Sequence, residues 1–470
     1  MRNIKRLANI LWLAFEKGSL VALSAISFFV FALYLTPAEL GLAALAIVFC
    51  ELITRFLCAA IENPLIRCTD NTLRAMSSAF YVGGVFSLLV TFLACILLYL
   101  INKESHIWLM LLVLSASVLS SVLSRPFIAS LRTQRAFKDL ALRTVWGKVL
   151  GAASGIFVAI KGGGEWSLIT QLIVMNASSF FILLLGDKSF LNTRPSIASF
   201  VIILKEGAPI GYRKLLNELF DKSIIILLAI VTTPTMLGYY TFARRLVELP
   251  KQAIDTAVMS YAVPVFTSRT NQRELNSLFI QISRSIVFIA LPICVFYGVF
   301  GSPFIAPLFG EKWAPATIYF LCLALISGVH MFSVLIPPMQ AALATSHIGL
   351  KAEAVKLLVS LCLAFILGHQ FGVMGMIAAI AIDVFALTII RLSSLSKSMK
   401  IELKSFISFF LGLSTITYTL VLACLYVINQ YSLEGIQVLV LAPIIAVLYL
   451  LMCRLFLSVS ISKVIQHFRD

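Results

Sequence analysis

The sequence predicts an all-α, polytopic membrane protein, and its composition, its long apolar segments and the charges between those segments support this prediction. Of the 470 residues, 60% are hydrophobic and only 12% are Asp, Glu, Lys or Arg, about half of the usual charged share. So few charges cannot cover a soluble chain of this length, which excludes soluble globular, disordered and fibrous proteins. The surplus of 37 basic over 21 acidic residues then indicates basic cytoplasmic loops and anionic lipid rather than nucleic acid.

Apolar segments of membrane-spanning length recur along the whole chain. A transmembrane helix needs about 20 apolar residues, and fourteen segments approach or exceed that length. They are residues 10–35, 41–61, 77–101, 107–129, 144–160, 165–185, 207–232, 236–265, 278–301, 317–341, 355–371, 373–393, 407–428 and 435–456. The first follows a basic start without a small-residue cleavage site, so we expect a membrane span rather than a signal peptide.

The loops between these segments predict the topology. Basic residues follow even-numbered spans, among them Arg132, Arg135, Lys138, Lys188, Arg194, Arg269, Lys397 and Lys400. The other loops carry Lys103, Lys161 and Lys312 and little else that is basic. Because cytoplasmic loops are rich in Lys and Arg, we expect both termini in the cytoplasm.

A repeated turn predicts two homologous lobes. The motif TPxxLG occurs at Thr36–Gly41 and again at Thr233–Gly238, with an offset of 197 residues. The same offset places Lys17 on Lys214 and Glu51 on Glu248. Since six spans separate the copies, both lobes have the same orientation in the membrane. We therefore expect an N-lobe over residues 1–200, a C-lobe over 201–394, and two further spans with a cytoplasmic tail over 395–470, with a transport cavity between the lobes.

Charges inside the spans are the candidates for that cavity, because intramembrane charges mark transport routes. They concentrate in the leading pair of spans of each lobe, and a spacing of four puts Lys214, Glu218 and Lys222 on one helix face. The expected substrate-binding residues are Arg245, Arg244, Lys222, Lys214, Lys17 and Arg55. The expected ion-coupling residues are Asp255, Asp221, Glu218 and Glu248.

Structural roles compete with these assignments. Lys17 and Lys214 lie near the cytoplasmic ends of their spans, where long basic side chains also serve as interfacial anchors. Glu218 with Lys222, and Arg244 with Glu248, have the spacing of intrahelical ion pairs. We expect Arg245 to be the main substrate contact, with Glu248 as its partner in the empty state, and Pro250 to bend the helix between them and Asp255. The nine Cys and five His residues show no metal-ligand spacing, so no metal site is expected.

Several short motifs resemble one exporter family. They are Leu11-Trp12 with Glu16-Lys17, then Leu35–Leu42, Asn63–Arg67, Gln134–Lys138, Gly164–Leu168, Tyr239–Pro250 and Gly310–Trp313. Their order and spacing resemble the Wzx-type polysaccharide exporters, in particular the branch similar to the colanic acid exporter, of the multidrug/oligosaccharidyl-lipid/polysaccharide exporter superfamily. The chain departs from that family in carrying Arg244 beside the family's arginine at Arg245, and in a C-lobe that is richer in charge.

This resemblance implies a two-lobed membrane transporter in the bacterial inner membrane and no catalytic residues. It implies a flippase that moves undecaprenyl-diphosphate-linked oligosaccharides to the periplasmic leaflet by alternating access, for O-antigen, capsule or exopolysaccharide synthesis. A polysaccharide polymerase and a chain-length regulator are the expected protein partners. No cofactor is expected, apart from coupling to H⁺ or Na⁺ through the acidic residues named above.

Two other functions remain open. A drug or cation antiporter of the same superfamily would need an acidic or aromatic cavity. An O-antigen polymerase or ligase would resemble other such enzymes in a large periplasmic loop, but the longest external connection, residues 302–316, is short.

Overall fold

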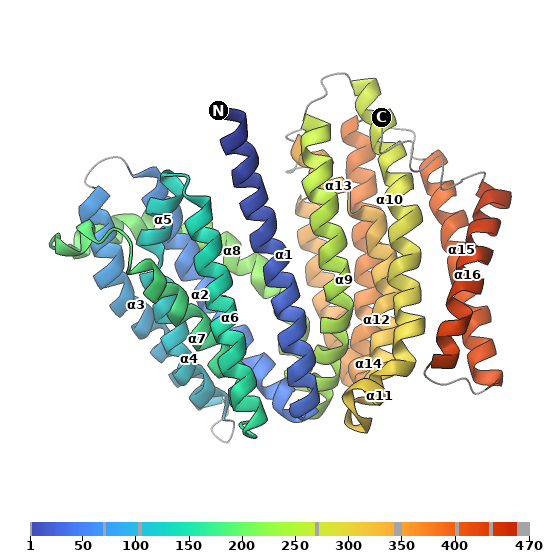
Figure 1. The fold of residues 1–470 in the computed structure, drawn as a ribbon, viewed down its shortest axis with the longest axis horizontal. Helices are drawn as coiled ribbons and strands as arrows, with labels where there is room; N and C mark the ends of the chain where they lie inside the picture. The colour runs from blue at the N-terminus through green and yellow to red at the C-terminus, as the bar shows by residue number, and fades with distance from the viewer. Residues whose placement is uncertain are drawn as a thin grey trace. The chain divides into compact units, whose positions relative to one another are not determined.

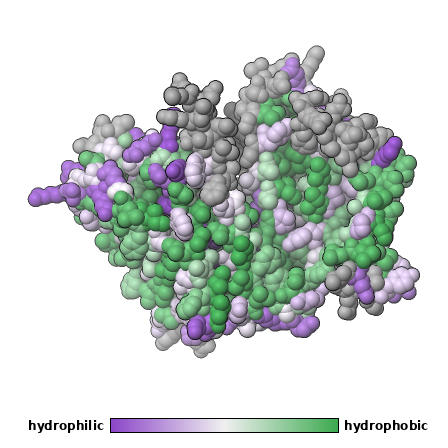
Figure 2. Space-filling view, viewed as in Figure 1, coloured by the Kyte–Doolittle hydropathy of each residue, from purple (hydrophilic) through white to green (hydrophobic). Residues whose placement is uncertain are grey.

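The computed structural model describes residues 2–68, 72–101, 106–267, 272–342, 350–399, 404–431 and 436–457. Within these ranges the chain is helical and forms no strand, and ten helices are long and apolar enough to cross a membrane. In the face shown in Figure 2, hydrophobic side chains cover the middle of the helices and hydrophilic ones gather towards their ends. The protein is therefore a multi-pass membrane protein of the all-α class, as its composition predicts.

By internal packing the chain divides into two compact units (Figure 1). The first contains residues Met1–Ala229 and Thr233–Gly238, and the second contains Ile230–Thr232 and Tyr239–Asp470. The helix Ile197–Val231 thus packs almost wholly with the first unit, although the sequence repeat assigns it to the second lobe. The lobe boundaries at residues 200 and 394 remain a proposal based on the repeat.

The first unit consists of eight α-helices among its described residues. They are α1 (Arg2–Tyr34), α2 (Pro37–Arg67), α3 (Thr72–Ile101), α4 (Ile107–Leu123), α5 (Arg125–Thr133), α6 (Phe137–Ile160), α7 (Trp166–Leu183) and α8 (Ile197–Val231), with the short 3₁₀ helix η1 (Ser189–Asn192) before α8. α1 and α7 both pack against α6 (Figure 1). A glycine at every fourth position of α6, Gly147, Gly151 and Gly155, brings α6 against α7 so closely that a Cβ would overlap α7 atoms.

The second unit begins with α9 (Pro234–Thr267), whose first turn packs in the first unit. The other elements are α10 (Gln272–Gly301), η2 (Ser302–Phe304), α11 (Ile305–Phe309), η3 (Glu311–Trp313), α12 (Ala316–His330), η4 (Met331–Ser333), α13 (Ile336–Ala342), α14 (Leu350–Met399), α15 (Lys404–Gln430) and α16 (Ile436–Leu457). Its core lies mainly between α10, α12 and α15. Trp313 is fully buried and stacks on Phe242, with ring centroids 4.2 Å apart.

Each expected span coincides with helical structure; two of them are interrupted, and two others are joined in one bent helix. The expected span 107–129 ends at Leu123, and α5 begins at Arg125 because Pro126 suits a first helical turn but not a helix interior. The span 317–341 is divided between α12 and α13. The spans 355–371 and 373–393 are the two arms of α14, which bends at Gly372, where φ is +60°. This bend brings Gly375 against Leu367 and Gly368 against Met376.

The two TPxxLG turns lie against each other within the first unit. In each copy the threonine hydroxyl caps a helix: Thr36 accepts from the Glu39 amide at 3.4 Å, and Thr233 accepts from the Met236 amide at 3.4 Å. Glu39 completes a capping box by accepting from the Thr36 amide at 2.7 Å. The glycine that ends each motif faces the proline of the other copy, where a Cβ would overlap the proline carbonyl oxygen.

Candidate functional site

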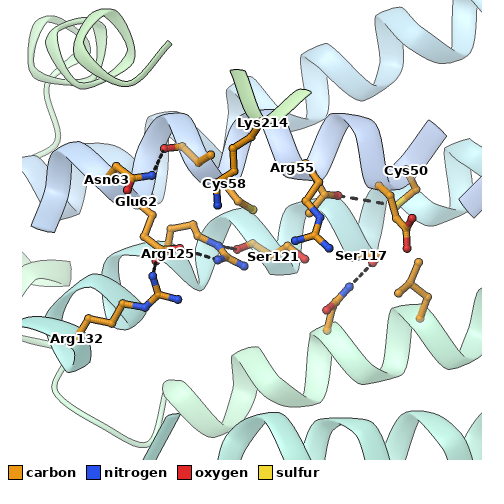
Figure 3. A pocket seen from close by; sticks show the side chains of 15 residues that line it. Cys50, Arg55, Cys58, Glu62, Asn63, Ser117, Ser121, Arg125, Arg132 and Lys214 are labelled. Carbon is orange, nitrogen blue, oxygen red and sulfur yellow. Dashed lines mark hydrogen bonds and ion pairs between the residues drawn. The ribbon is translucent and has the colours of Figure 1, made fainter. Parts of the chain in front are cut away.

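A polar cavity of about 310 Å³ opens inside the first unit, between α2, α4, α5, α7 and α8 (Figure 3). Its volume lies at the lower end of the range for small-molecule sites, about 300–1,000 Å³. Its lining is Cys50, Glu51, Thr54, Arg55, Cys58, Ala59, Glu62, Asn63, Ser117, Ser121, Arg125, Arg132, Leu172, Asn176 and Lys214. Basic side chains outnumber acidic ones four to two in this lining, and no aromatic side chain takes part in it.

Two ion pairs of opposite polarity connect α2 and α8 along one wall of the cavity. Glu51 Oε2 lies 2.9 Å from Lys222 Nζ, and Arg55 Nε lies 3.3 Å from Glu218 Oε2. The residue numbers rise on α2 as they fall on α8, so the two helices run antiparallel. Gly207 packs directly on the Ala60 backbone, which permits this close approach because glycine has no Cβ.

Glu62 forms the centre of a second charge cluster at the other end of the cavity. Its side chain is 8% exposed; Oε2 accepts a hydrogen bond from Arg125 at 2.8 Å, and Oε1 forms an ion pair with Arg132 at 2.5 Å. Arg125 and Arg132 are seven residues apart, two turns of α5, and therefore share a helix face. Arg125 Nε also donates to the Ser121 carbonyl at 2.9 Å. A buried carboxylate is tolerated here because two guanidinium groups neutralise and hydrogen-bond it.

Lys214 differs from the other basic groups of the lining. It extends from α8 towards Cys58 (Figure 3) and forms no ion pair with any residue in the described part of the chain. Arg55 keeps 60% of its side chain exposed despite its pair with Glu218. The cavity thus presents an ammonium group and an accessible guanidinium group to a ligand, and this arrangement favours an anion.

The wall opposite α8 carries neutral polar groups. Asn176 Nδ2 on α7 donates to Ser117 Oγ on α4 at 2.6 Å. Ser121, one turn further along α4, also lines the cavity, and Asn63 does so from α2. Hydroxyl and amide groups both donate and accept, so this wall suits a ligand that is rich in hydroxyl groups.

The second unit has charged groups of its own. On α9, Arg244 Nε donates to Glu248 at 2.6 Å, whereas Arg245 forms no ion pair with any described residue. His330 Nε2 at the end of α12 lies 3.9 Å from the Asp255 carboxylate. Between the two arms of α14, Asp383 accepts from Lys356 at 2.6 Å and from Ser360 at 2.5 Å.

The structure brings the residues predicted from the sequence into two groups. Arg55, Lys214, Glu218 and Lys222 lie together around the first-unit cavity, with Lys214 and Arg55 in its lining and Glu218 and Lys222 paired to α2. The second group, Arg244, Arg245, Glu248 and Asp255, lies on α9. Lys17 and Asp221 are in α1 and α8, but their side chains lie outside the described residues.

Of the two intrahelical pairs that compete with a functional role, one is confirmed. Arg244 pairs with Glu248 at the i, i+4 spacing, so the expected pairing of Glu248 with Arg245 was wrong. Glu218 and Lys222 do not pair with each other but with Arg55 and Glu51 across the interface of α2 and α8.

The sequence interpretation missed Glu62, Arg125 and Arg132. The loop charges predict Arg132 in a cytoplasmic loop, whereas α5 extends to Thr133 and turns it towards Glu62. A signal was nevertheless present, because Arg125 is a lone charge in an otherwise apolar span. Glu51, Arg55 and Glu62 are separated by four and then seven residues, which places them on one face of α2. Lys356, Asp383 and His330 were missed as well.

The chain is similar in sequence to proteins of polysaccharide biosynthesis. The family described as polysaccharide biosynthesis protein matches residues 30–318, well over half of the chain. The succinoglycan biosynthesis transport protein ExoT of Rhizobium meliloti is 23% identical over 335 residues, which cover 68% of this chain and 66% of that protein, just under two thirds of its length.

Solved structures share the fold at low sequence identity. The lipid II flippase MurJ, in an inward closed conformation, superposes with a TM-score of 0.74 at 18% identity, over 95% of this chain and 98% of that one. An inward-facing multidrug resistance transporter of the MATE family, within the MOP superfamily, gives 0.60 at 17% identity, over 83% and 98%. These likenesses confirm the predicted all-α fold. The match over residues 30–318 shows that the chain belongs to the family of polysaccharide biosynthesis proteins.

Proposed function

We propose that the protein is a flippase for undecaprenyl-diphosphate-linked oligosaccharides, which it moves from the cytoplasmic to the periplasmic leaflet of a bacterial inner membrane. The observation that carries the proposal is the first-unit cavity, whose lining holds four basic and two acidic groups. A diphosphate carries several negative charges, and transfer of even one ion into hydrocarbon costs tens of kcal/mol by Born solvation. A protein that moves such a head group therefore needs a polar, cationic cavity at membrane depth.

The place of the cavity fits loading from the cytoplasm. Most of its α2 residues, those from Thr54 to Asn63, lie in the half of the helix remote from the TPxxLG turn, and Cys50 and Glu51 lie near the middle. The loop charges favour a periplasmic position for that turn and cytoplasmic termini. The cavity therefore belongs to the cytoplasmic half of the membrane in this topology, where the lipid-linked sugar is made available.

Lys214 and Arg55 are the proposed first contacts of the diphosphate. Lys214 forms no ion pair with the described residues, so it binds an anion without losing a protein partner. Arg55 exchanges the Glu218 carboxylate for a phosphate, for which its planar guanidinium provides a two-pronged donor. Because Glu218 is on α8, this exchange loosens one of the two α2–α8 ion pairs only when substrate is bound. Such differential binding is what a substrate needs to shift a conformational equilibrium.

The neutral wall is proposed to hold the first sugar of the oligosaccharide. Asn176, Ser117 and Asn63 supply donors and acceptors for hydroxyl groups, and the prenyl chain remains in the lipid. Arg245, with Arg244 beside it, is proposed as a later contact in the second unit. Lys17 and Lys222 are proposed to add positive charge along the route, and Asp255, Asp221, Glu218 and Glu248 to couple transport to H⁺ or Na⁺.

The rival function of a drug or cation antiporter fits the cavity less well. An organic cation requires acidic or aromatic surroundings, whereas this lining is mainly basic and contains no aromatic side chain. A polymerase or ligase function is disfavoured because the relatives are described as transporters and flippases. A polymerase and a chain-length regulator are instead proposed as partners that act on the translocated product.

Reconstituted transport tests the function. A fluorescent undecaprenyl-diphosphate disaccharide is placed in liposomes, and dithionite added outside quenches only the molecules in the outer leaflet. Quenching of the inner-leaflet molecules should be faster in liposomes that contain the purified protein than in protein-free liposomes. Lys214→Gln should slow this about tenfold, the loss expected for one charge-assisted contact. Lys205→Gln is the matched control, since Lys205 is an exposed lysine on the same helix outside the lining. Transport of ethidium but not of the lipid would support the antiporter instead.

A further inference from the structure

A second, smaller cavity adjoins the first one inside the same unit, and we call it the annex. Its volume is about 100 Å³. Its lining is Ser121, Ser124, Arg125, Arg143, Thr144, Met175, Asn176 and Ser179, from α4, α5, α6 and α7. Three of these residues, Ser121, Arg125 and Asn176, also line the larger cavity. A ligand in the larger cavity therefore contacts a wall of the annex.

The lining of the annex is that of an oxyanion site. It contains two guanidinium groups, four hydroxyl groups and one amide, and Met175 is its one apolar member. No carboxylate belongs to the lining. Arginine with surrounding hydroxyl donors binds carboxylate and phosphate groups with charge-assisted hydrogen bonds.

The size of the annex limits what it can hold. At about 100 Å³ it has about a third of the volume of the larger cavity, which is about 310 Å³. This is room for a carboxylate or a single phosphate group beside a ligand in the larger cavity. A ligand in the annex is therefore a side group of something bound in the larger cavity, or a small free anion.

Its walls are held in place by close packing. A Cβ at Gly147 would overlap Ser179 Oγ, so α6 and α7, which carry most of the annex lining, are in direct contact and cannot approach further. Arg125 is fixed from the other side by its bonds to Glu62 and to the Ser121 carbonyl. These two bonds leave further N–H donors on the guanidinium group, which has five. A pre-formed donor set of this kind binds its ligand with little loss of entropy.

We propose that the annex is a second anion subsite, which takes a carboxylate or phosphate group carried by the oligosaccharide while the lipid diphosphate occupies the larger cavity. The preferred substrate is then an acidic oligosaccharide. This inference rests on the proposed flippase function, because it assumes that a lipid-linked glycan enters the larger cavity.

The test compares two synthetic lipid-linked disaccharides that differ only in one sugar, glucose or glucuronic acid. Wild-type protein in liposomes should flip the acidic lipid about tenfold faster at limiting concentration, the effect of one charge-assisted hydrogen bond. Arg143→Gln should remove this preference and leave the neutral lipid at the wild-type rate. Arg143→Lys should keep part of the preference, since it retains the charge but not the two-pronged geometry. Equal rates for both lipids in the wild type, or equal losses for both in Arg143→Gln, would overturn the proposal.

A binding measurement separates this inference from the proposed function. Full-length protein in nanodiscs is titrated separately with ¹³C-labelled glucuronate, with ¹³C-labelled glucose and with inorganic phosphate. Binding is followed by the line broadening of the ligand, in ¹³C NMR for the sugars and in ³¹P NMR for phosphate. Glucuronate binding that Arg143→Gln abolishes supports the annex even if neither lipid is transported, in which case the flippase function alone fails. Phosphate binding without glucuronate binding would mean that the annex serves a phosphate of the lipid head or a free anion, which overturns the acidic-glycan assignment. The absence of both would overturn the subsite itself.

Discussion

Gly41 and Gly238 occupy the same position in the two TPxxLG motifs, and each packs against the proline of the other copy. A Cβ on Gly41 would overlap the Pro234 carbonyl oxygen, and a Cβ on Gly238 would overlap that of Pro37. The contact is reciprocal, so the repeat found in the sequence corresponds to a physical pairing of the two turns. The conformational freedom of glycine is not required here, since both residues are helical; the absent side chain is.

Substitution of either glycine should destabilise the protein. Gly41→Ala and Gly238→Ala each force the two helix starts apart, at a cost of about 1–3 kcal/mol in the free energy of unfolding, as for other overpacked sites. The measurement is the thermal unfolding temperature of the purified protein in detergent. Gly18→Ala is the control, because no atom lies within 4 Å of a Cβ at Gly18, and alanine favours a helix. An unchanged unfolding temperature in both motif variants would contradict the close contact.

The ion pair between Glu51 on α2 and Lys222 on α8 should tolerate a swap of the two residues, but not the inversion of one charge alone. Glu51→Lys places two ammonium groups within the 2.9 Å contact now made with Lys222, and like charges repel at this distance. Transport should therefore fall strongly in Glu51→Lys and in Lys222→Glu. The double variant restores the attraction and should recover most of the activity. A double variant as inactive as the singles would show that these residues contact substrate individually rather than hold the two helices together.

Glu62 should be important for stability rather than for binding. Glu62→Gln leaves Arg125 without its charged partner at a position where the Glu62 side chain is 8% exposed, and loss of one member of a buried pair costs about 3–5 kcal/mol. We expect low abundance and a lowered unfolding temperature. Glu206→Gln, an exposed change on α8, should leave both unchanged. If Glu62→Gln is as stable as wild type, the cluster does not hold α2 and α5 together.

Substitutions of Arg244 and Arg245, which are neighbours on α9, should have different effects. Arg244→Ala removes the partner of Glu248 at 2.6 Å and should lower the unfolding temperature. Arg245 forms no ion pair with the described residues, so Arg245→Ala should leave stability unchanged while it abolishes transport. Arg245→Lys should retain part of the transport, because the charge remains but the planar donor fork is lost. The comparison needs protein abundance measured beside flipping rate, and full transport by Arg245→Ala would remove this residue from the substrate route.

The sequence was sufficient for the helices and for part of the site. Apolar length predicts the spans well because lipid requires every backbone donor and acceptor to be satisfied within the helix. The i, i+4 rule also placed Lys214, Glu218 and Lys222 on one face, and that face does meet the cavity wall. Such local rules depend only on residues a few positions apart.

Contacts between distant segments were not predictable in the same way. Glu218 pairs with a residue more than 160 positions earlier, and local spacing alone favoured Lys222 as its partner. The partners of Glu62 depended on a helix break at Ser124, which turns α5 and its two arginines back towards α2. The surplus of basic groups in the cavity is evident only when α2, α5 and α8 are packed together.

Photo-crosslinking shows directly whether the first-unit cavity binds the diphosphate head. The probe is an undecaprenyl-diphosphate sugar with a diazirine on the first sugar, added to wild-type protein in nanodiscs, and labelled peptides are identified by mass spectrometry. We predict labelling of the cavity segments 50–63, 117–125 and 172–176, with competition by unlabelled lipid and strong reduction in Lys214→Gln. Competed labelling that avoids these segments and persists in Lys214→Gln would contradict it.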